Sequence, residues 1–513
     1  MPPSQGRLAA HVGAGIVVTR VLGFVRERVF AHYFGNGIEA DAFRAALRIP
    51  NAIRNLLGEG TLSASFIPVF AGMLERGEEE DASRLAGIIA SLLIVLTAVA
   101  AILGIVLAPI ITDFAAPGFE GYERDLTVKL VRIMFPMSGA LILSAWCLGV
   151  LNTYRKFFLS YAAPAVWNIA QIATLIALGG HLAGASLVTA LAWGALTGGI
   201  LQIGIQLPTV LKLVQRIRWG FDVSAPGVRA VARAWLPVVF GAGVVQVSSV
   251  IDTQLASFLG SGAVATLGYA QLIAILPISL FGVSVAAVAL PELSRDAATD
   301  ANDLIRLRLS EGLRQVIFFA IPSAFMFATL APQIVGALFQ TGAFSARDTS
   351  VVAGVLAAYS LAIPAQASIK LLASGHYALG DTRTPVRIAV LSVVVSAVAA
   401  FALMRYFDAA GIALGASAGA YLNVTLNSIA LRRRVGRTAT PDAYRSVGAT
   451  AIGATAAAWL SAEAAGLAGE TLWLSVVAGL STFTVVYAVT TLGLRHPEAT
   501  RIMRALKRSM SHD

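Results

Sequence analysis

The sequence has little charge and almost no cysteine. Asp, Glu, Lys and Arg make up only 13% of its 513 residues, whereas a soluble domain carries about a quarter. The single cysteine, Cys147, excludes a disulfide within the chain. No polar segment between the apolar stretches is long enough to form a soluble catalytic domain. These absences exclude a soluble enzyme.

Apolar runs long enough to cross a bilayer recur from one end of the chain to the other. Hydrophobic residues make up 57% of the sequence, and the mean hydropathy is +0.76. This pattern predicts an all-α polytopic membrane protein with about 14 transmembrane helices. The expected spans lie at roughly 8–33, 39–72, 85–111, 125–152, 158–180, 186–211, 230–259, 263–293, 311–339, 349–378, 385–405, 409–431, 446–466 and 471–494. Prolines inside these spans predict kinks, at Pro50, Pro136, Pro237, Pro277, Pro322 and Pro364.

The basic residues alternate between the loops. Strings such as "YRKF", "KLVQRIRWG" and "LRRRVGR" fall on one side of the predicted membrane, and the loops on the other side carry almost no Lys or Arg. The positive-inside rule then places both termini in the cytoplasm, which agrees with an even number of spans. The net charge of +10 is therefore a sign of topology, and no nucleic-acid partner is expected.

The first six spans resemble the next six. "YFGNGIEADAFRAALRIP" at 33–50 aligns with "FLGSGAVATLGYAQLIAILP" at 258–277, since each has a short glycine turn followed by a helix with a proline. Both halves start on the cytoplasmic side, which predicts two six-helix lobes related by a pseudo-twofold axis along the membrane normal. We expect an N-lobe at 1–220, a C-lobe at 221–440, two extra helices at 441–494 and a basic cytoplasmic tail at 495–513.

Charged residues gather on the first two spans, where lipid would disfavour them. Asp41, Arg44 and Arg48 share one face of span 2 at spacings of three and four residues. The other charged residues of this cluster are Arg20, Arg26, Glu27, Arg28, Arg54 and Glu59. One interpretation is mutual neutralisation, through the pairs Arg20–Glu27, Asp41–Arg44 and Arg54–Glu59. The favoured one is an anion site in a cavity at the lobe boundary, because cations outnumber acids and arginine grips phosphate in a bidentate manner.

The second lobe has fewer charges in its spans. Asp252 in span 7 is either a cation or proton site or a partner for a basic side chain. Lys370 in span 10 lies deep enough to reach an anion, and His376 is expected at the membrane interface. No metal site and no bound cofactor are expected.

Several strings resemble one transporter family. "TRVLGFVRERVFAHYFG", "RIPNAIRNLLGEGTLSASFIPVF", "LPISLFGVSVAAVALPELSR" and "GHYALGDTRTPVRIA" are similar to the MurJ (MviN) family of lipid II flippases, within the multidrug/oligosaccharidyl-lipid/polysaccharide exporter superfamily. The resemblance covers nearly the whole chain and weakens in the last two spans. It implies a bacterial inner-membrane transporter, not an enzyme. Such a protein moves undecaprenyl-pyrophosphate-linked peptidoglycan precursor from the cytoplasmic to the periplasmic leaflet by alternating access, with the peptidoglycan synthesis machinery as a further partner.

The resemblance also implies roles for particular residues. Arg20, Arg26 and Arg54 match arginines that hold the pyrophosphate, and Lys370 matches a lysine of span 10. Asp41 matches an acid linked to gating, and Arg48 and Glu59 complete the charge of the cavity. The two extra helices at 441–494 correspond to a groove for the lipid tail.

Two positions depart from the family pattern. Leu272 stands where many relatives carry an arginine. Some members bind sodium through an acid of span 7, and here only Ser392 and Ser396 of span 11 could assist Asp252. Coupling to sodium, to protons or to the membrane potential therefore stays open.

Alternatives to lipid II transport also remain. An exporter of another polyprenyl-pyrophosphate glycan would need the same arginines. A drug/cation antiporter is less expected, because its cavity should carry acids. A membrane glycosyltransferase would need catalytic carboxylates on a substantial external loop.

Overall fold

A computed structural model describes residues 5–214, 217–299, 301–436, 441–469 and 471–510. In these residues the regular structure is entirely helical, and no strand is present. The chain forms two compact units, which we describe separately. Unit 1 comprises 1–265 with 341–344, and unit 2 comprises 266–340 with 345–513.

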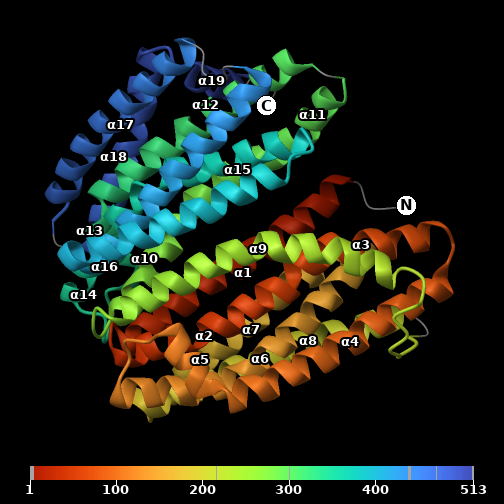
Figure 1. The fold of residues 1–513 in the computed structure, drawn as a ribbon. Coiled ribbons are helices and arrows are strands. Elements are labelled where there is room, and N and C mark those ends of the chain that lie inside the picture. The colour runs from red at the N-terminus through yellow and green to blue at the C-terminus, as the bar shows by residue number, and fades with distance from the viewer. Residues whose placement is uncertain (1–4, 215–216, 300, 437–440, 470, 511–513) are drawn as a thin grey trace. The chain divides into compact units, whose positions relative to one another are not determined.

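Unit 1 contains the first nine helices and the beginning of the tenth (Figure 1). They are α1 (Gln5–Phe34), α2 (Ile38–Leu57), α3 (Glu59–Glu75), α4 (Glu79–Val106), α5 (Ala108–Ala115), α6 (Gly121–Thr153), α7 (Phe157–Leu178), α8 (Gly184–Leu213), α9 (Val228–Ser257) and α10 (Ala263–Pro277).

Unit 2 contains the rest of α10 and the following helices. They are the π-helix η1 (Ile278–Val283), α11 (Ser284–Ala298), α12 (Asn302–Thr329), α13 (Ala331–Phe339), α14 (Ala346–Ser360), α15 (Ile363–Ala378), α16 (Arg383–Val435), α17 (Pro441–Leu467), α18 (Leu472–Gly493) and α19 (Pro497–Met510). α17 and α18 run side by side, and α17 also packs on α12 (Figure 1).

The centre of unit 1 is α6, which packs against α2, α3, α4, α7 and α8. Most of its apolar face is buried, and Trp146 has no more than 2% of its surface exposed. Small residues bring the neighbouring helices together. A methyl group on Gly198 of α8 would lie 2.9 Å from the Cβ of Ala170 on α7. Such close backbone approach is typical of helices that pack within a membrane.

The helices agree with the predicted spans to within a few residues at most ends. Ten helices of the described chain are long and apolar enough to cross a membrane, or eleven if the bent pair α14 and α15 is one span. α16 also contains two helical arms, since Asp408 breaks it with φ 47° and ψ −135°. α1 and α17 are long but fall outside that count. The all-α membrane fold is confirmed, and the exact number of 14 spans is supported only approximately.

The compact units do not follow the expected lobe boundaries. α9 was expected to open the second lobe, but it belongs to unit 1, where it packs on α2 and α3. Polar contacts described below join α9 to α2, and Val228 and Val231 of α9 pack in the same apolar cluster as residues of α3. The lobes were predicted from an internal repeat of the sequence, whereas the units are defined by contacts in the structure. The two divisions need not coincide, so the lobes stay a prediction.

The main helix breaks lie close to only some of the prolines. Pro50 lies inside α2, and the chain breaks eight residues later at Gly58. Pro277 directly precedes η1, and Pro364 begins α15 after a bend of 41°.

Candidate substrate-binding site

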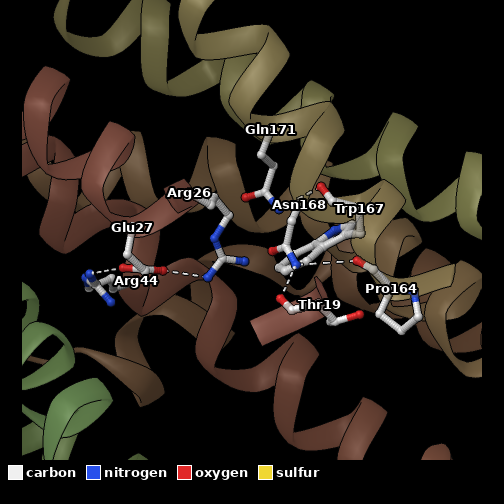
Figure 2. A network of polar contacts seen from close by, with 8 residues as sticks. All are labelled: Thr19, Arg26, Glu27, Arg44, Pro164, Trp167, Asn168 and Gln171. Carbon is white, nitrogen blue, oxygen red and sulfur yellow. Dashed lines mark hydrogen bonds and ion pairs between the residues drawn. The ribbon is translucent and has the colours of Figure 1, made fainter. Parts of the chain in front are cut away.

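Glu27 joins the first two helices through a pair of ionic contacts (Figure 2). Its side chain is buried, with Oε1 accepting from Arg26 Nη2 at 2.5 Å and Oε2 accepting from Arg44 Nη2 at 2.6 Å. The guanidinium of Arg44 also lies over the ring of Phe30, 5.3 Å from its centroid. A single carboxylate therefore stabilises two cations inside the unit, which satisfies the demand that a buried charge be paired.

This network differs from the pairs that the sequence indicated. The neutralisation interpretation, which was not the favoured one, had placed Glu27 beside Arg20 and Arg44 beside Asp41. Arg20 and Glu27 are seven residues apart, which places their Cβ atoms on one helix face. The long, flexible side chain of Arg26 nevertheless reaches the carboxylate of the adjacent Glu27. Arg20 is exposed on α1.

The other side of Arg26 faces α7 (Figure 2). Its guanidinium lies 4.8 Å from the centroid of the Trp167 ring, at cation–π distance. Two hydrogen bonds hold α7 against α1. Thr19 Oγ1 donates to the carbonyl of Tyr161 at 2.8 Å, and Asn168 Nδ2 donates to the carbonyl of Thr19 at 3.5 Å. Arg26 is thus fixed between a carboxylate and an aromatic face, with 20% of its side chain exposed.

Trp167 also borders a cavity of about 580 Å³ in unit 1. Its polar lining consists of Arg54, Asn55, Ser144, Trp167, Gln202 and Gln246. Hydrogen bonds fix part of this wall. Gln202 Nε2 donates to Ser144 Oγ at 2.8 Å, and Ser144 Oγ donates to Gln206 Oε1 at 2.6 Å. The cavity combines one guanidinium with neutral amide and hydroxyl groups, which can bind phosphate oxygens and sugar hydroxyls.

α2 is linked to α9 by Arg48. Its Nε donates to Thr253 Oγ1 and its Nη1 donates to Ser249 Oγ, both at 2.7 Å. Arg48 also interacts electrostatically with Asp252, which is partly buried on α9. Lower on the same helices, Asn55 Nδ2 donates to Gln246 Oε1 at 3.3 Å. The role of Asp252, as a cation or proton site or as a partner of a basic side chain, stays a prediction.

Asp41 is fully buried and caps the beginning of α10. Its Oδ2 accepts from the backbone N–H of Gly262 at 2.5 Å, and its Oδ1 accepts from that of Ala265 at 2.6 Å. Such N–H groups have no partner within their own helix. Gly262 is required here, because its φ is +91° and a Cβ would lie 2.4 Å from the carbonyl oxygen of Asn36. Asp41 therefore fixes the turn between α9 and α10 onto α2.

Most of the chain matches the sequence pattern of one known protein family. The family described as "Lipid II flippase MurJ" matches residues 30–478, most of the chain. The chain belongs to the MurJ family.

Curated relatives agree with this assignment. The lipid II flippase MurJ of Burkholderia cenocepacia is 34% identical over 435 residues, which cover 83% of this chain and 84% of the relative. The probable lipid II flippase MurJ of Rhizobium tropici is 32% identical over 431 residues, covering 82% of this chain and 80% of the relative. The resemblance found in the sequence is confirmed, and the curated names describe transporters rather than enzymes.

Solved structures share the fold of this MurJ-family chain. A structure titled "Lipid II flippase MurJ, inward closed conformation" matches with a TM-score of 0.77 and 23% identity, covering 94% of this chain and 99% of that one. An inward-facing multidrug resistance MATE family transporter of the MOP superfamily matches with a TM-score of 0.65 and 15% identity, covering 81% and 94%. The expected superfamily fold is therefore found.

Some predicted site residues come together in unit 1 of this MurJ-family chain. Arg26, Arg48 and Arg54 lie with Asp41 on α1 and α2, and their partners come from α1, α2, α7, α9 and the start of α10. The side chain of Glu59 lies outside the described residues. The sequence assigned these residues a role in binding or gating, and that role stays a prediction.

The remaining candidates lie apart or in unit 2. Lys370 is exposed on α15. Ser396 is buried on the first arm of α16, and a Cβ added to Gly419 of the second arm would lie 2.7 Å from the Cβ of Ser396. Ser396 thus packs between the two arms of α16. His376 lies in the last turn of α15 and is completely buried, with Asp381 beside it and Arg434 paired to that aspartate. Its expected place at the membrane interface stays a prediction. No group of three or more His, Cys, Asp or Glu side chains in the described chain is placed to hold a metal ion.

The search for charged residues missed the neutral part of the site. Trp167, Asn168, Gln202 and Gln246 were not singled out, because amides and indoles in apolar spans stand out less than ions. One signal was present in the sequence. Gln202 and Gln206 lie four residues apart in an apolar span, and such spacing places polar groups on one helix face.

Proposed function

We propose that this chain is a flippase for lipid II, the undecaprenyl-pyrophosphate-linked precursor of peptidoglycan. The observation that carries the proposal is membership of the MurJ family over residues 30–478, with curated lipid II flippases among the relatives. The expected location is the bacterial inner membrane, and the ten or eleven apolar spans of the described chain support it.

The arginines of unit 1 support binding of a pyrophosphate. Arg26 is oriented by Glu27 and Trp167, while Arg54 borders the cavity that Trp167 also lines. A guanidinium offers a planar fork of donors that matches phosphate oxygens. Because Glu27 already neutralises part of the charge, an entering pyrophosphate must compete with a carboxylate. Such competition keeps binding moderate, and a transporter must also release what it binds.

The neutral wall of the same cavity supports a substrate that is more than a phosphate. Asn55, Gln202 and Gln246 offer amide groups beside Arg54. Amides donate and accept hydrogen bonds, as hydroxyl and N-acetyl groups of sugars require. An antiporter for cationic drugs would instead need uncompensated acids in this cavity, and none of its described lining residues is acidic.

For the lipid tail we propose a route along the apolar surface of unit 2. A groove of about 460 Å³ lies between α12, α14, α15, α16 and α17, with an almost entirely apolar lining. α17 contributes Ala451 to this groove, and α12 contributes Phe325. Of the two extra helices, α17 therefore borders this groove, which supports a tail-binding role for α17. We further propose that both termini lie in the cytoplasm and that the headgroup moves outward by alternating access.

Growth complementation tests the proposal in bacteria depleted of their own lipid II flippase. Wild type should restore growth, and Arg26→Ala and Arg54→Ala should fail at matched membrane levels. Arg76→Ala is the matched control, because Arg76 is an exposed arginine whose one ion pair among the described residues is with nearby Glu78. Failure of an inserted wild type would point to another polyprenyl-linked glycan. Full rescue by both alanine variants would refute the phosphate role of the two arginines.

A further inference from the structure

A second basic cavity lies in unit 2, where α18 ends and α19 begins. Its volume is about 590 Å³. Three arginines from three different elements line it, namely Arg314 of α12, Arg445 of α17 and Arg495 of the turn between α18 and α19. The rest of the lining comes from α17 and from the segment between α18 and α19, namely Ser446, Gly448, Ala449, Ile452, Leu494, His496 and Pro497.

The charge of this cavity is only partly balanced. Glu498 is buried and accepts from Arg314 Nε at 3.0 Å. Arg445 and Arg495 are exposed, and their side chains form no ion pair with any described residue. Two cations are therefore available to an anion from solution or from a membrane.

His496 makes the floor of the cavity rigid and neutral. Its Nδ1 accepts from the backbone N–H of Glu498 at 3.2 Å, and its Nε2 lies 3.3 Å from Thr450 Oγ1. His496 is 1% exposed, and its ring centroid lies 4.6 Å from the ring centroid of Phe318. Burial lowers the pKa of His496 below its ordinary value, so the arginines supply the positive charge.

Arg495 occupies a backbone position that favours glycine. α18 ends with the N–H of His496 donating to the carbonyl of Thr491, and Arg495 has a φ of 54°. The same bond pattern ends α15, where the corresponding residue is Gly380 with a φ of 71°. Glycine adopts this left-handed conformation without strain, and arginine does not. Strained residues of this kind cluster at functional sites, which indicates a use for the arginine side chain.

The surroundings point to a membrane lipid as the source of the anion. α18 is one of the apolar spans, and α19 is an amphipathic helix with Arg501, Arg504 and Lys507 exposed. Ile502 and Met503 of α19 line a separate apolar groove of about 460 Å³ together with residues of α12 and α18. A basic amphipathic helix following a membrane span is typical of a segment that lies at the lipid headgroups.

We propose that the cavity formed by Arg314, Arg445 and Arg495 binds the phosphate of an acidic phospholipid headgroup, with the acyl chains beside the apolar groove of α12, α18 and α19. Basic pockets at the ends of membrane helices recognise such headgroups. The two available guanidinium groups can both donate to phosphate oxygens. This site is separate from the substrate site proposed in unit 1.

Lipid titration of the delipidated full-length protein, read by native mass spectrometry, tests this site. Dioleoylphosphatidylglycerol is the probe, and dioleoylphosphatidylcholine is the comparison lipid. Wild type should bind the acidic lipid at least about tenfold more tightly. Arg495→Gly and Arg445→Ala should each weaken its binding on the order of tenfold, because each removes a charged hydrogen bond, and should leave phosphatidylcholine binding unchanged.

The glycine variant separates binding from folding. Since glycine suits the left-handed turn, Arg495→Gly should keep or raise the thermal unfolding temperature while losing lipid affinity. Arg501→Ala is the matched control, because it removes an α19 charge that does not line the cavity. An equal loss with Arg501→Ala would show diffuse attraction and overturn the site. Equal binding of both lipids by wild type, or displacement of the acidic lipid by millimolar inorganic phosphate, would overturn the lipid assignment.

Discussion

The contact between Asp41 and the start of α10 predicts how much the free energy of opening this turn changes when Asp41 is replaced. In Asp41→Asn, one carboxylate oxygen becomes an NH2 group that faces a backbone N–H. One of the hydrogen bonds of 2.5 and 2.6 Å must then be lost. A hydrogen bond to a charged group contributes about 1.5–3 kcal/mol, so local opening of the turn should become easier by roughly that amount.

Hydrogen exchange measured by mass spectrometry on peptides that cover 261–266 should detect this change. A free-energy change of about 1.5–3 kcal/mol corresponds to roughly ten- to hundredfold faster exchange of the Gly262 and Ala265 amides. Glu39→Gln is the matched control, because it is the same chemical change two residues away. Within the part of the chain that the structure describes, the side chain of Glu39 accepts one long bond, of 3.4 Å from Tyr122. Unchanged exchange at 261–266 in Asp41→Asn, in a protein that is otherwise folded, would refute the capping role.

Three further changes test other parts of the structure. Glu27→Gln should destabilise the protein by about 1.5–3 kcal/mol, because it removes the buried carboxylate that accepts charged hydrogen bonds from two partly buried guanidinium groups. Arg44→Met in addition should recover part of the loss. Ser144→Ala should cost about 1–3 kcal/mol, because Gln206 Oε1 loses its buried donor. Burial lowers the pKa of His496 below 6.5, so the unfolded chain binds the proton first as the pH falls, and thermal stability should decrease from pH 7.5 to 5.5. His496→Gln should flatten that decrease.

Each of these tests has an outcome that contradicts it. Equal denaturation midpoints for wild type and Glu27→Gln would show that the ionic network is not important for stability. The same result for Ser144→Ala would mean that water replaces the hydroxyl. A pH profile of thermal unfolding that is identical in wild type and His496→Gln would exclude the histidine as the titrating group.

Hydropathy predicted the helices well, because each span must remain apolar over its whole length. It could not predict where helices break without a strong signal. The chain breaks at Gly58 between α2 and α3, eight residues after the proline that was expected to mark the kink. Polar loops and the end of a hydrophobic run are visible in a sequence, whereas a break inside an apolar run depends on packing.

The site was predictable in its composition and not in its contacts. Arg26 and Asp41 were both singled out, but the one partner that the sequence suggested for Asp41 was Arg44, whereas Asp41 caps amides more than 220 residues away. Helical spacing describes neighbours within one helix only. It contains no information on which distant backbone donor lacks a partner, and a buried carboxylate binds whichever donor the fold brings to it.

The π-helix η1 after Pro277 has a consequence for comparing relatives. Its i→i+5 hydrogen bonds place an extra residue in the turn compared with an α-helix, and one residue corresponds to a rotation of about 100°. The side chains of α11 therefore point in directions that a continuous α-helix from 263 would not give them. A relative lacking one residue within 278–283 would regain ordinary helical phase and keep the same faces exposed to lipid. A one-residue deletion at this point should thus be silent for the fold, while an alignment without a gap across it would compare residues from different helix faces.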